Sequence, residues 1–253
     1  FVLMQAEKEH EVIKLYESKK TGLAKPVEAS VLFNVAEAYF RTAQYEQAIL
    51  LFEQYIKDWS HTSASSKARL RVALASEFLD KPFREVIALY RATIDHSTDF
   101  ETSYEAKIRF VSMQNLRPKI IGEENREFRA FLNNPNDLKL DTNLQKLLWL
   151  VRLRMFLVDQ KYEDALTYLT AIPVNNLRKE DKSVFEADGA EIIYGLLLNL
   201  YKKGSYSEII KLWGLYRDLY IEKVANDPLV TFVVGKSYLE LGLYEGMQKI
   251  LQN

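Results

Sequence analysis

The sequence contains no cysteine among its 253 residues, so disulfides, thiolate metal sites and cysteine nucleophiles are excluded. Glycine and proline are scarce as well, at 9 and 6 residues, which disfavours turn-rich all-β folds and long disordered stretches. No apolar run approaches the roughly 18 residues of a membrane span. The opening Phe1–Met4 is too short for the apolar core of a signal peptide and lacks a basic leader, so we expect an export signal to be absent or already removed.

The sequence also has no excess of charge of one sign. Its 34 basic and 35 acidic side chains leave a formal net charge of −1. Binding to DNA or RNA depends on a strongly basic face. The composition therefore predicts no nucleic-acid partner, and the basic pairs Lys19–Lys20 and Lys202–Lys203 are expected to end helices, where the helix dipole favours cations.

Motifs for catalysis or ligand binding are missing too. The 3 histidines, His10, His61 and His96, lie far apart, and none belongs to a His-Glu-x-x-His motif. The sequence has neither a glycine-rich phosphate loop nor a Gly-x-Ser-x-Gly elbow. Adjacent carboxylates such as Glu123–Glu124 diverge on a helix instead of converging on a substrate. We therefore predict that the protein is not an enzyme and has no catalytic residue, cofactor or metal.

What the sequence does contain is a helical repeat, which is clearest between Ala29 and Ser60. Counted from Ala29 as position 1, small residues stand at positions 8 and 20, aromatic residues stand at 11, 17 and 24, and a helix break falls near 32. These residues are Ala36, Ala48, Tyr39, Tyr45, Phe52 and Ser60. Two antiparallel helices, A and B, can cross closely only where the contact residues are small, so the spacing predicts a helix pair.

The same frame recurs along the chain. Equivalents of position 17 fall at residues 9, 45, 83, 121, 162, 206 and 244, with spacings from 36 to 44. The match is strong in Lys203–Ile210 and Leu241–Glu245, and weak between 68 and 132, where Lys81–Pro82 is expected to distort a turn. A helix-turn-helix repeat of this kind usually spans 34 residues. The helices or the inter-repeat loops must therefore be several residues longer here.

This pattern resembles the tetratricopeptide repeat (TPR), most closely at 29–60 and 145–253. Ala43 and Tyr55 depart from it, because glycine is usual at position 15, where it supplies the left-handed conformation that ends helix A, and alanine is usual at 27. The resemblance implies an all-α fold, a right-handed α-α superhelix that forms a TPR-like solenoid of antiparallel helix pairs.

The first half of the chain has a narrower likeness. Tyr45–Ile49 and Phe52–Ser60, followed by a Ser-rich loop and Ala68–Leu70, look like bacterial envelope TPR proteins of the outer-membrane assembly lipoprotein and Tol–Pal coordinator type. This resemblance implies a location in the bacterial periplasm or envelope, and the cytoplasm is the alternative.

We expect residues 1–253 to form one TPR-like solenoid, as a segment of a longer protein. The chain opens on a lone B-type helix, roughly Gln5–Glu17, and no solubilising cap helix is recognisable at either end. The turn clusters Asn133–Asp137 and Pro173–Asn176 interrupt the array. The first, with the residues to Asp141, is either an ordinary inter-repeat loop or a hinge near 133–141 between two halves.

In a TPR-like array the A helices line the concave face, where positions 2, 5, 6, 9, 12 and 13 point. These positions combine aromatic and aliphatic side chains with scattered cations, which suits a peptide with apolar anchors and some acidic groups. The alternative for each side chain is packing against a neighbouring helix. The predicted partner-binding residues are Phe33, Asn34, Glu37, Arg41, Arg71, Phe78, Arg154, Tyr194, Tyr201, Lys202, Phe232 and Lys236.

Two functions fit these observations. The first is a non-enzymatic protein–protein interaction scaffold that binds a partner peptide or domain on its concave face in a bacterial envelope assembly. The alternative is a structural subunit of a larger complex, such as a motor or secretion assembly, which is joined through its ends or convex face. Both predict a protein or peptide partner without nucleic acid or direct membrane insertion.

Overall fold

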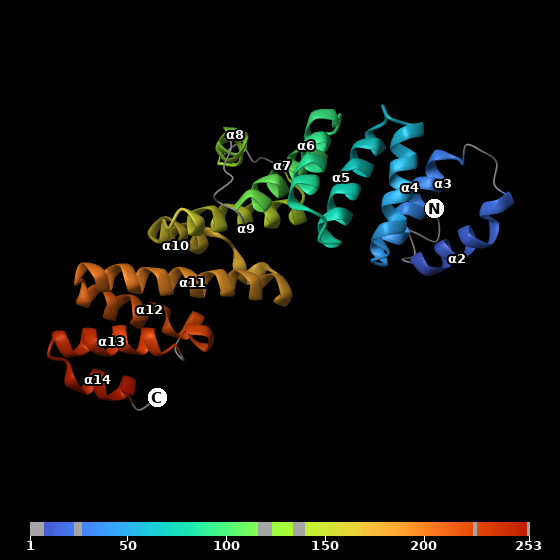
Figure 1. The fold of residues 1–253 in the computed structure, drawn as a ribbon. Coiled ribbons are helices and arrows are strands. Elements are labelled where there is room, and N and C mark those ends of the chain that lie inside the picture. The colour runs from blue at the N-terminus through green and yellow to red at the C-terminus, as the bar shows by residue number, and fades with distance from the viewer. Residues whose placement is uncertain (1–7, 23–26, 116–122, 134–139, 225–226, 252–253) are drawn as a thin grey trace. The chain divides into compact units, whose positions relative to one another are not determined.

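The computed structural model describes residues 8–22, 27–115, 123–133, 140–224 and 227–251. Every regular element in these ranges is a helix (Figure 1). The chain divides into two compact units, unit 1 at Phe1–Leu144 and unit 2 at Gln145–Asn253. Over the described ranges, no helix is both long and apolar enough to span a membrane.

Unit 1 is built from helices that pack in chain order, each against the next (Figure 1). The A helices are α3, α5 and α7, and the B helices are α2, α4, α6 and α8. Their bounds are α2 (Glu9–Lys19), the short 3-10 helix η1 (Lys20–Gly22), α3 (Ala29–Arg41), α4 (Tyr45–Asp58), α5 (Ser63–Phe78), α6 (Phe83–His96), α7 (Phe100–Asn115) and α8 (Glu123–Leu132).

The core of unit 1 follows the predicted frame. Ala36 of α3 and Ala48 of α4 are completely buried, as expected for small residues at a helix crossing, and Phe52 fills the space beside them. A second apolar cluster joins α5, α6 and α7 around Tyr90 and Phe110, which are also fully buried. Large residues packed around small ones thus hold successive helix pairs together.

Unit 2 repeats the arrangement with helices that vary more in length. Its A helices are α9, α11 and α13, and one apolar cluster joins them to the B helices α10, α12 and α14. The elements are α9 (Thr142–Val158, whose first residues belong to unit 1), α10 (Tyr162–Ala171), the 3-10 helix η3 (Val174–Asn176), α11 (Lys179–Lys203), α12 (Tyr206–Val224), α13 (Pro228–Glu240) and α14 (Tyr244–Leu251).

Five turns from helix A to helix B share one geometry. In the first, Ala43 adopts a φ of 58°, its N–H donates to the carbonyl of Phe40, and the next N–H, of Gln44, donates to the carbonyl of Tyr39 at 2.9 Å. This pair of bonds is a Schellman motif. The left-handed residues of the five turns are Ala43, Asp80, Gln160, Gly204 and Gly242. The left-handed conformation predicted at position 15 therefore forms with or without glycine.

The turn at Lys81–Pro82 keeps this geometry. The Lys81 N–H donates to the carbonyl of Ser76 at 3.1 Å, as the motif requires. Pro82 then adds one residue before α6 and serves as its N-cap. The expected distortion is therefore a one-residue insertion that follows an intact Schellman motif.

The sequence predicts a loop in the Ser-rich stretch after Ser60. This prediction is wrong, because α5 begins at Ser63. The hydroxyl of Thr62 accepts the Ser65 N–H at 3.2 Å and caps the helix. Serine and threonine satisfy the free N–H groups of a first helical turn, so they start this helix. His61 lies directly before the cap.

The long repeat spacing is explained most clearly in unit 2. α11 has 25 residues, against 13 in α3, so the widest interval between position-17 residues comes from a lengthened A helix. Pro173–Asn176, predicted as a turn, contains the short helix η3. The lone first helix is observed as Glu9–Lys19, and α11 ends at Lys203 as predicted for the basic pair.

The all-α solenoid prediction is confirmed, since both units are stacks of antiparallel helix pairs with a TPR-like repeat. The chain divides at 144/145, just beyond the proposed hinge segment 133–141. Residues 134–139 of that segment lie outside the described residues, so the hinge stays a prediction. Ile121, taken as the position-17 residue of the fourth unit, also lies outside them.

Candidate protein-binding groove

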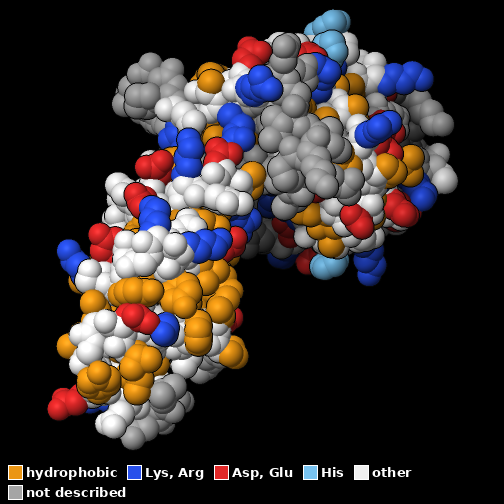
Figure 2. Space-filling view, turned by 60° about the vertical axis from the view of Figure 1, so that its left-hand side comes forward, with side chains coloured by type: hydrophobic (Ala, Val, Ile, Leu, Met, Phe, Trp, Pro, Cys, Tyr) orange, Lys and Arg blue, Asp and Glu red, His pale blue; other side chains and the backbone are white. Residues whose placement is uncertain are grey.

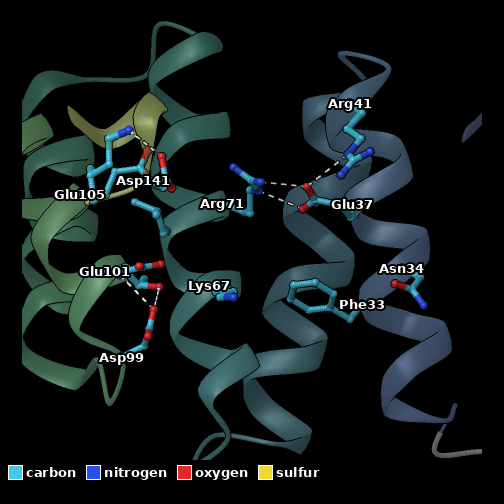
Figure 3. A pocket seen from close by; sticks show the side chains of 13 residues that line it. Phe33, Asn34, Glu37, Arg41, Lys67, Arg71, Asp99, Glu101, Glu105 and Asp141 are labelled. Carbon is cyan, nitrogen blue, oxygen red and sulfur yellow. Dashed lines mark hydrogen bonds and ion pairs between the residues drawn. The ribbon is translucent and has the colours of Figure 1, made fainter. Parts of the chain in front are cut away.

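A hollow of about 560 Å³ lies on the A-helix face of unit 1 (Figure 3). We call it the unit 1 groove. Its walls come from α3, α5 and α7, with a short contribution from the start of α9. The lining residues are Phe33, Asn34, Glu37, Arg41, Lys67, Leu70, Arg71, Asp99, Glu101, Thr102, Glu105, Asp141 and Leu144. Five of them are carboxylates and three are cations, so the lining is acidic on balance.

Glu37 is the centre of an ion-pair network between α3 and α5. It is only 7% exposed, and Arg71 donates to both of its oxygens at 2.9 and 2.8 Å. Arg41 approaches the same carboxylate at 3.5 Å (Figure 3). It also bonds Glu9 of α2 at 3.1 Å. Arg71 lies over the Phe40 ring, 4.7 Å from its centroid. Both groove arginines are therefore committed to the fold.

The groove residues form two rows at the repeat interval. Glu37 and Arg71 are 34 residues apart, and the same interval leads from Arg71 to Glu105. One turn away, the same interval leads from Phe33 to Lys67 and from Lys67 to Glu101. Figure 3 shows Lys67 between Phe33 and Glu101. Each row thus crosses three successive A helices.

Most carboxylates on the α7 side have structural partners. Asp99 accepts the N–H and the hydroxyl of Thr102, and these bonds hold the pKa of its carboxyl below the ordinary value. Asp141 caps α9 by accepting the N–H of Leu144 at 2.9 Å. Glu105 pairs with Arg109 at 2.8 Å. Glu101 is exposed, and within the described part of the chain it has no ion pair or side-chain hydrogen bond.

Phe33 is the aromatic side chain of the unit 1 groove. It is half-buried, and its ring packs edge-on against Phe52 at 5.6 Å and Tyr55 at 5.3 Å. Tyr55, which stands where the repeat usually has alanine, therefore positions the ring from helix B. A half-buried aromatic side chain with a fixed orientation can contact a partner at little cost in conformational entropy.

The structure groups the predicted residues of unit 1 unevenly. Five of them line the unit 1 groove, namely Phe33, Asn34, Glu37, Arg41 and Arg71. Phe78 does not line it, although its ring is 53% exposed, because it packs against Tyr45 at 5.2 Å and Phe40 at 6.1 Å. That these residues bind a partner stays a prediction.

In unit 2 the predicted residues lie on α9, α11 and α13. Arg154 donates to the carboxylate of Asp188 at 3.0 Å, and Asp188 is only 7% exposed. The two residues are 34 positions apart in the sequence, as Arg71 and Glu37 are in unit 1. Tyr201 contacts Phe232 with ring centroids 6.0 Å apart, and Lys236 pairs with Glu240 at 2.5 Å. The remaining predicted residues are Tyr194, which is half-buried, and Lys202, which is exposed at the end of α11.

Large apolar side chains are also exposed near the predicted residues of unit 2. Figure 2 shows hydrophobic side chains gathered over the part of unit 2 that holds α11–α14. The exposed large hydrophobic residues of α13, α14 and the turn between them are Leu229, Phe232, Leu239, Leu241, Leu243 and Tyr244. We call these six residues the α13–α14 apolar face.

Several residues of the unit 1 groove were missed from the sequence. Lys67, Glu101 and Glu105 lie on α5 and α7, where the match to the repeat is weak. The 34-residue interval from Phe33 would have found Lys67 and then Glu101. Asp99 and Asp141 give no such signal, because they reach the groove from helix N-termini.

The titratable residues offer no metal-binding cluster in the part of the chain that the structure describes. His10, His61 and His96 are each exposed, on α2, before α5 and at the end of α6. The strongest perturbations of tyrosine follow burial: the pKa of Tyr39 is raised to about 12 by burial and by its 2.8 Å bond to Glu17. The bond from Tyr39 to Glu17 therefore joins α3 to α2.

No family model matches the sequence, and no curated protein matches it. A solved structure described as the TPR2AB domain–pHSP90 complex of yeast Sti1 is similar at 14% identity with a TM-score of 0.36, covering 99% of this chain and 84% of that one. At that TM-score the likeness supports no conclusion about function. The TPR-like helical repeat fold is established here by the helix pairs, their buried small residues and their shared turn geometry.

Proposed function

We propose that this chain is a non-enzymatic protein–protein interaction scaffold that binds a partner peptide on the A-helix face of unit 1, within a bacterial envelope assembly. A TPR-like solenoid generally presents a binding surface and carries no reaction chemistry. The observation that favours the unit 1 groove is that an aromatic ring, a cation and a carboxylate from three successive A helices face one hollow (Figure 3).

The charges of the groove change the expected chemistry of the partner. The sequence suggested acidic groups on the peptide, to meet Arg41 and Arg71. Both arginines bond Glu37 instead, and the lining carries more carboxylates than cations. Partner segments that carry a basic side chain in addition to an apolar anchor are therefore favoured by electrostatic complementarity.

A peptide display selection against the purified chain tests this function. We expect selected peptides to bind the wild type and to bind Phe33→Ala at least tenfold more weakly, because an aromatic anchor of an interface is worth about 2 kcal/mol. Tyr194→Ala tests in the same way whether α11 contributes to binding of the selected peptides. The matched control is Leu50→Ala, since Leu50 is 66% exposed but lies on the B helix α4. Equal binding by Phe33→Ala and Leu50→Ala would rule out the groove.

The envelope location is supported by the sequence alone, through the absence of cysteine and the likeness of 45–70 to envelope TPR proteins. Fractionation of cells that express the complete native gene tests it. Recovery in the periplasmic or membrane fraction is expected, and recovery only with cytoplasmic markers contradicts it.

A second candidate, the structural subunit joined through its ends or convex face, is favoured by the α13–α14 apolar face. Tyr244 is 62% exposed and Leu243 is 49% exposed, and apolar side chains gathered on one surface mark interaction sites. Light scattering would compare the wild type with Leu243→Ser/Tyr244→Ser. A concentration-dependent assembly that the double variant abolishes supports this role, and a wild type that stays monomeric at high concentration counts against self-assembly.

A further inference from the structure

One row of the unit 1 groove combines a half-buried aromatic ring with two exposed charged side chains. Phe33, Lys67 and Glu101 follow one another at the repeat interval on α3, α5 and α7. Lys67 and Glu101 are exposed, and among the described residues neither forms an ion pair or a side-chain hydrogen bond. The neighbouring row behaves differently, because Glu37 bonds Arg71 and Glu105 bonds Arg109. The Glu37–Arg71 bond joins α3 to α5, whereas the charges of Lys67 and Glu101 are available to a partner.

The spacing of the available row fits an extended peptide. The A helices contact one another, α3 with α5 and α5 with α7. Packed helices lie about 8–10 Å apart. An extended polyproline II chain advances about 3.1 Å per residue with three residues per turn, so every third side chain faces the same way at intervals of about 9 Å. One step from helix to helix therefore corresponds to about three residues of a bound peptide.

Resting on the function proposed above, we infer that the unit 1 groove recognises an extended protein segment that carries an apolar, an acidic and a basic side chain in that order, about three residues apart. The apolar side chain packs on Phe33, the acidic one pairs with Lys67, and the basic one pairs with Glu101. The segment crosses α3, α5 and α7 and lies across the helix axes.

The charge distribution of the groove supports this order. The α7 side of the groove holds Asp99, Glu105 and Asp141 in addition to Glu101, so it favours a basic group. Lys67 projects from α5 toward the Phe33 side, where Arg41 and Arg71 are already neutralised by Glu37 (Figure 3). In the exchanged order the basic side chain would face Lys67 and the acidic side chain would face Glu101, so like charges would meet at both positions.

Two peptide isomers provide the test. The first is a capped peptide with leucine, glutamate and arginine separated by two serines each, as the spacing of the row requires for a polyproline II chain. The second exchanges glutamate and arginine, so that composition and net charge are unchanged. Both are also made in the reverse chain direction. We expect the matching order, in one of the two directions, to bind about tenfold tighter than its exchanged isomer at low ionic strength, and the difference to shrink in high salt.

A charge exchange in the protein tests the same pairing from the other side. Lys67→Glu/Glu101→Lys conserves net charge and replaces two exposed side chains, so folding is expected to be unchanged, and circular dichroism checks this. This variant should prefer the exchanged isomer. The matched control is Glu53→Lys/Lys57→Glu, an exposed pair on the B helix α4, which should keep the wild-type preference.

The outcomes separate this inference from the function on which it rests. Binding that Phe33→Ala weakens, with no preference between isomers or with the exchanged isomer preferred, overturns the charge order and leaves the groove as a peptide site. If neither the isomers nor a display library yields a peptide that depends on Phe33, the groove is not a peptide site and both proposals fail. A preference that inverts in Lys67→Glu/Glu101→Lys, and not in the control, supports the inference.

Discussion

The two units use the same helix pairs to present different surfaces. The A-helix face of unit 1 is a charged groove in which carboxylates outnumber cations. Around α11–α14, unit 2 exposes aromatic and aliphatic side chains, including Phe232 at 55% and Tyr244 at 62% (Figure 2). Since the cores follow one plan, the difference shows that the repeat sets the scaffold while the exposed side chains set the chemistry of each surface.

Both units have an ion pair that joins one A helix to the next. Glu37 bonds Arg71 across α3 and α5, and Asp188 bonds Arg154 across α11 and α9, each pair 34 residues apart. Both carboxylates are 7% exposed. Charged residues on the A helices thus join neighbouring repeats. Contact with a neighbouring helix was the alternative to partner binding for each predicted residue.

The largest expected effect comes from removing the charge of the brace in unit 1. Glu37→Gln leaves two arginines facing a neutral side chain, and we expect a loss of about 3 kcal/mol in the free energy of unfolding. Asp188→Asn removes a carboxylate with one arginine partner, and we expect about 1 kcal/mol. Urea denaturation monitored by circular dichroism measures both. Equal losses would show that the second arginine adds nothing, and Glu53→Gln on α4 should change stability by less than about 0.5 kcal/mol.

The next largest effect concerns the first residue of helix B. Tyr45 in unit 1 packs against Phe78 of the next A helix, whereas Tyr162 in unit 2 lies against Gly195, where an added Cβ would come within 2.4 Å of the ring. We expect Gly195→Ala to destabilise the protein by about 2 kcal/mol through overpacking. Thermal unfolding measures the change.

Gly214 is the matched control for that substitution. It lies within α12, and an added Cβ would meet nothing within 4 Å. Gly214→Ala should therefore stabilise the protein by up to about 1 kcal/mol, because alanine loses less backbone entropy in a helix. The same sign for both substitutions would contradict the close contact between Gly195 and Tyr162.

A smaller pair of effects tests the shared turn. Ala43 in unit 1 and Gly204 in unit 2 are both left-handed, with φ of 58° and 70°. Alanine is strained in that conformation by roughly 1 kcal/mol. Ala43→Gly should therefore stabilise and Gly204→Ala should destabilise the protein, each by about 1 kcal/mol, in chemical denaturation. Two changes of the same sign would show that the turns are not equivalent.

The smallest effect appears only in alkaline solution and belongs to unit 1. Burial and the bond to Glu17 raise the pKa of Tyr39 to about 12, above the value near 10 expected in the unfolded chain. The resulting stability is fully present below about pH 10 and is lost as pH rises toward 12. Tyr39→Phe should reduce the decline of the unfolding free energy over that range. Tyr244→Phe, at a side chain that is 62% exposed, should leave it unchanged.

Parts of this architecture could be predicted from local patterns. Ala36 and Ala48 stand at the crossing of α3 and α4 because only small side chains fit there, and that spacing is visible in the sequence. The Ser-rich start of α5 was misjudged, since serine and threonine favour both loops and N-caps, and only the hydrogen bond from Ser65 to Thr62 decides between them. The sequence indicated the extra turns of α11 only through the long interval between the position-17 residues on either side of it.

The sequence by itself determined the all-α class, the repeat and the small residues at the helix crossing of the clearest repeat, because these depend on the helical period and on residue size within one helix pair. Tertiary structure decided which charges are available. Arg71 and Lys67 lie one turn apart on the same helix, yet Arg71 is held by Glu37 of the preceding A helix while Lys67 has no such partner among the described residues. That distinction depends on the lateral packing of neighbouring repeats, which brings together residues 34 positions apart.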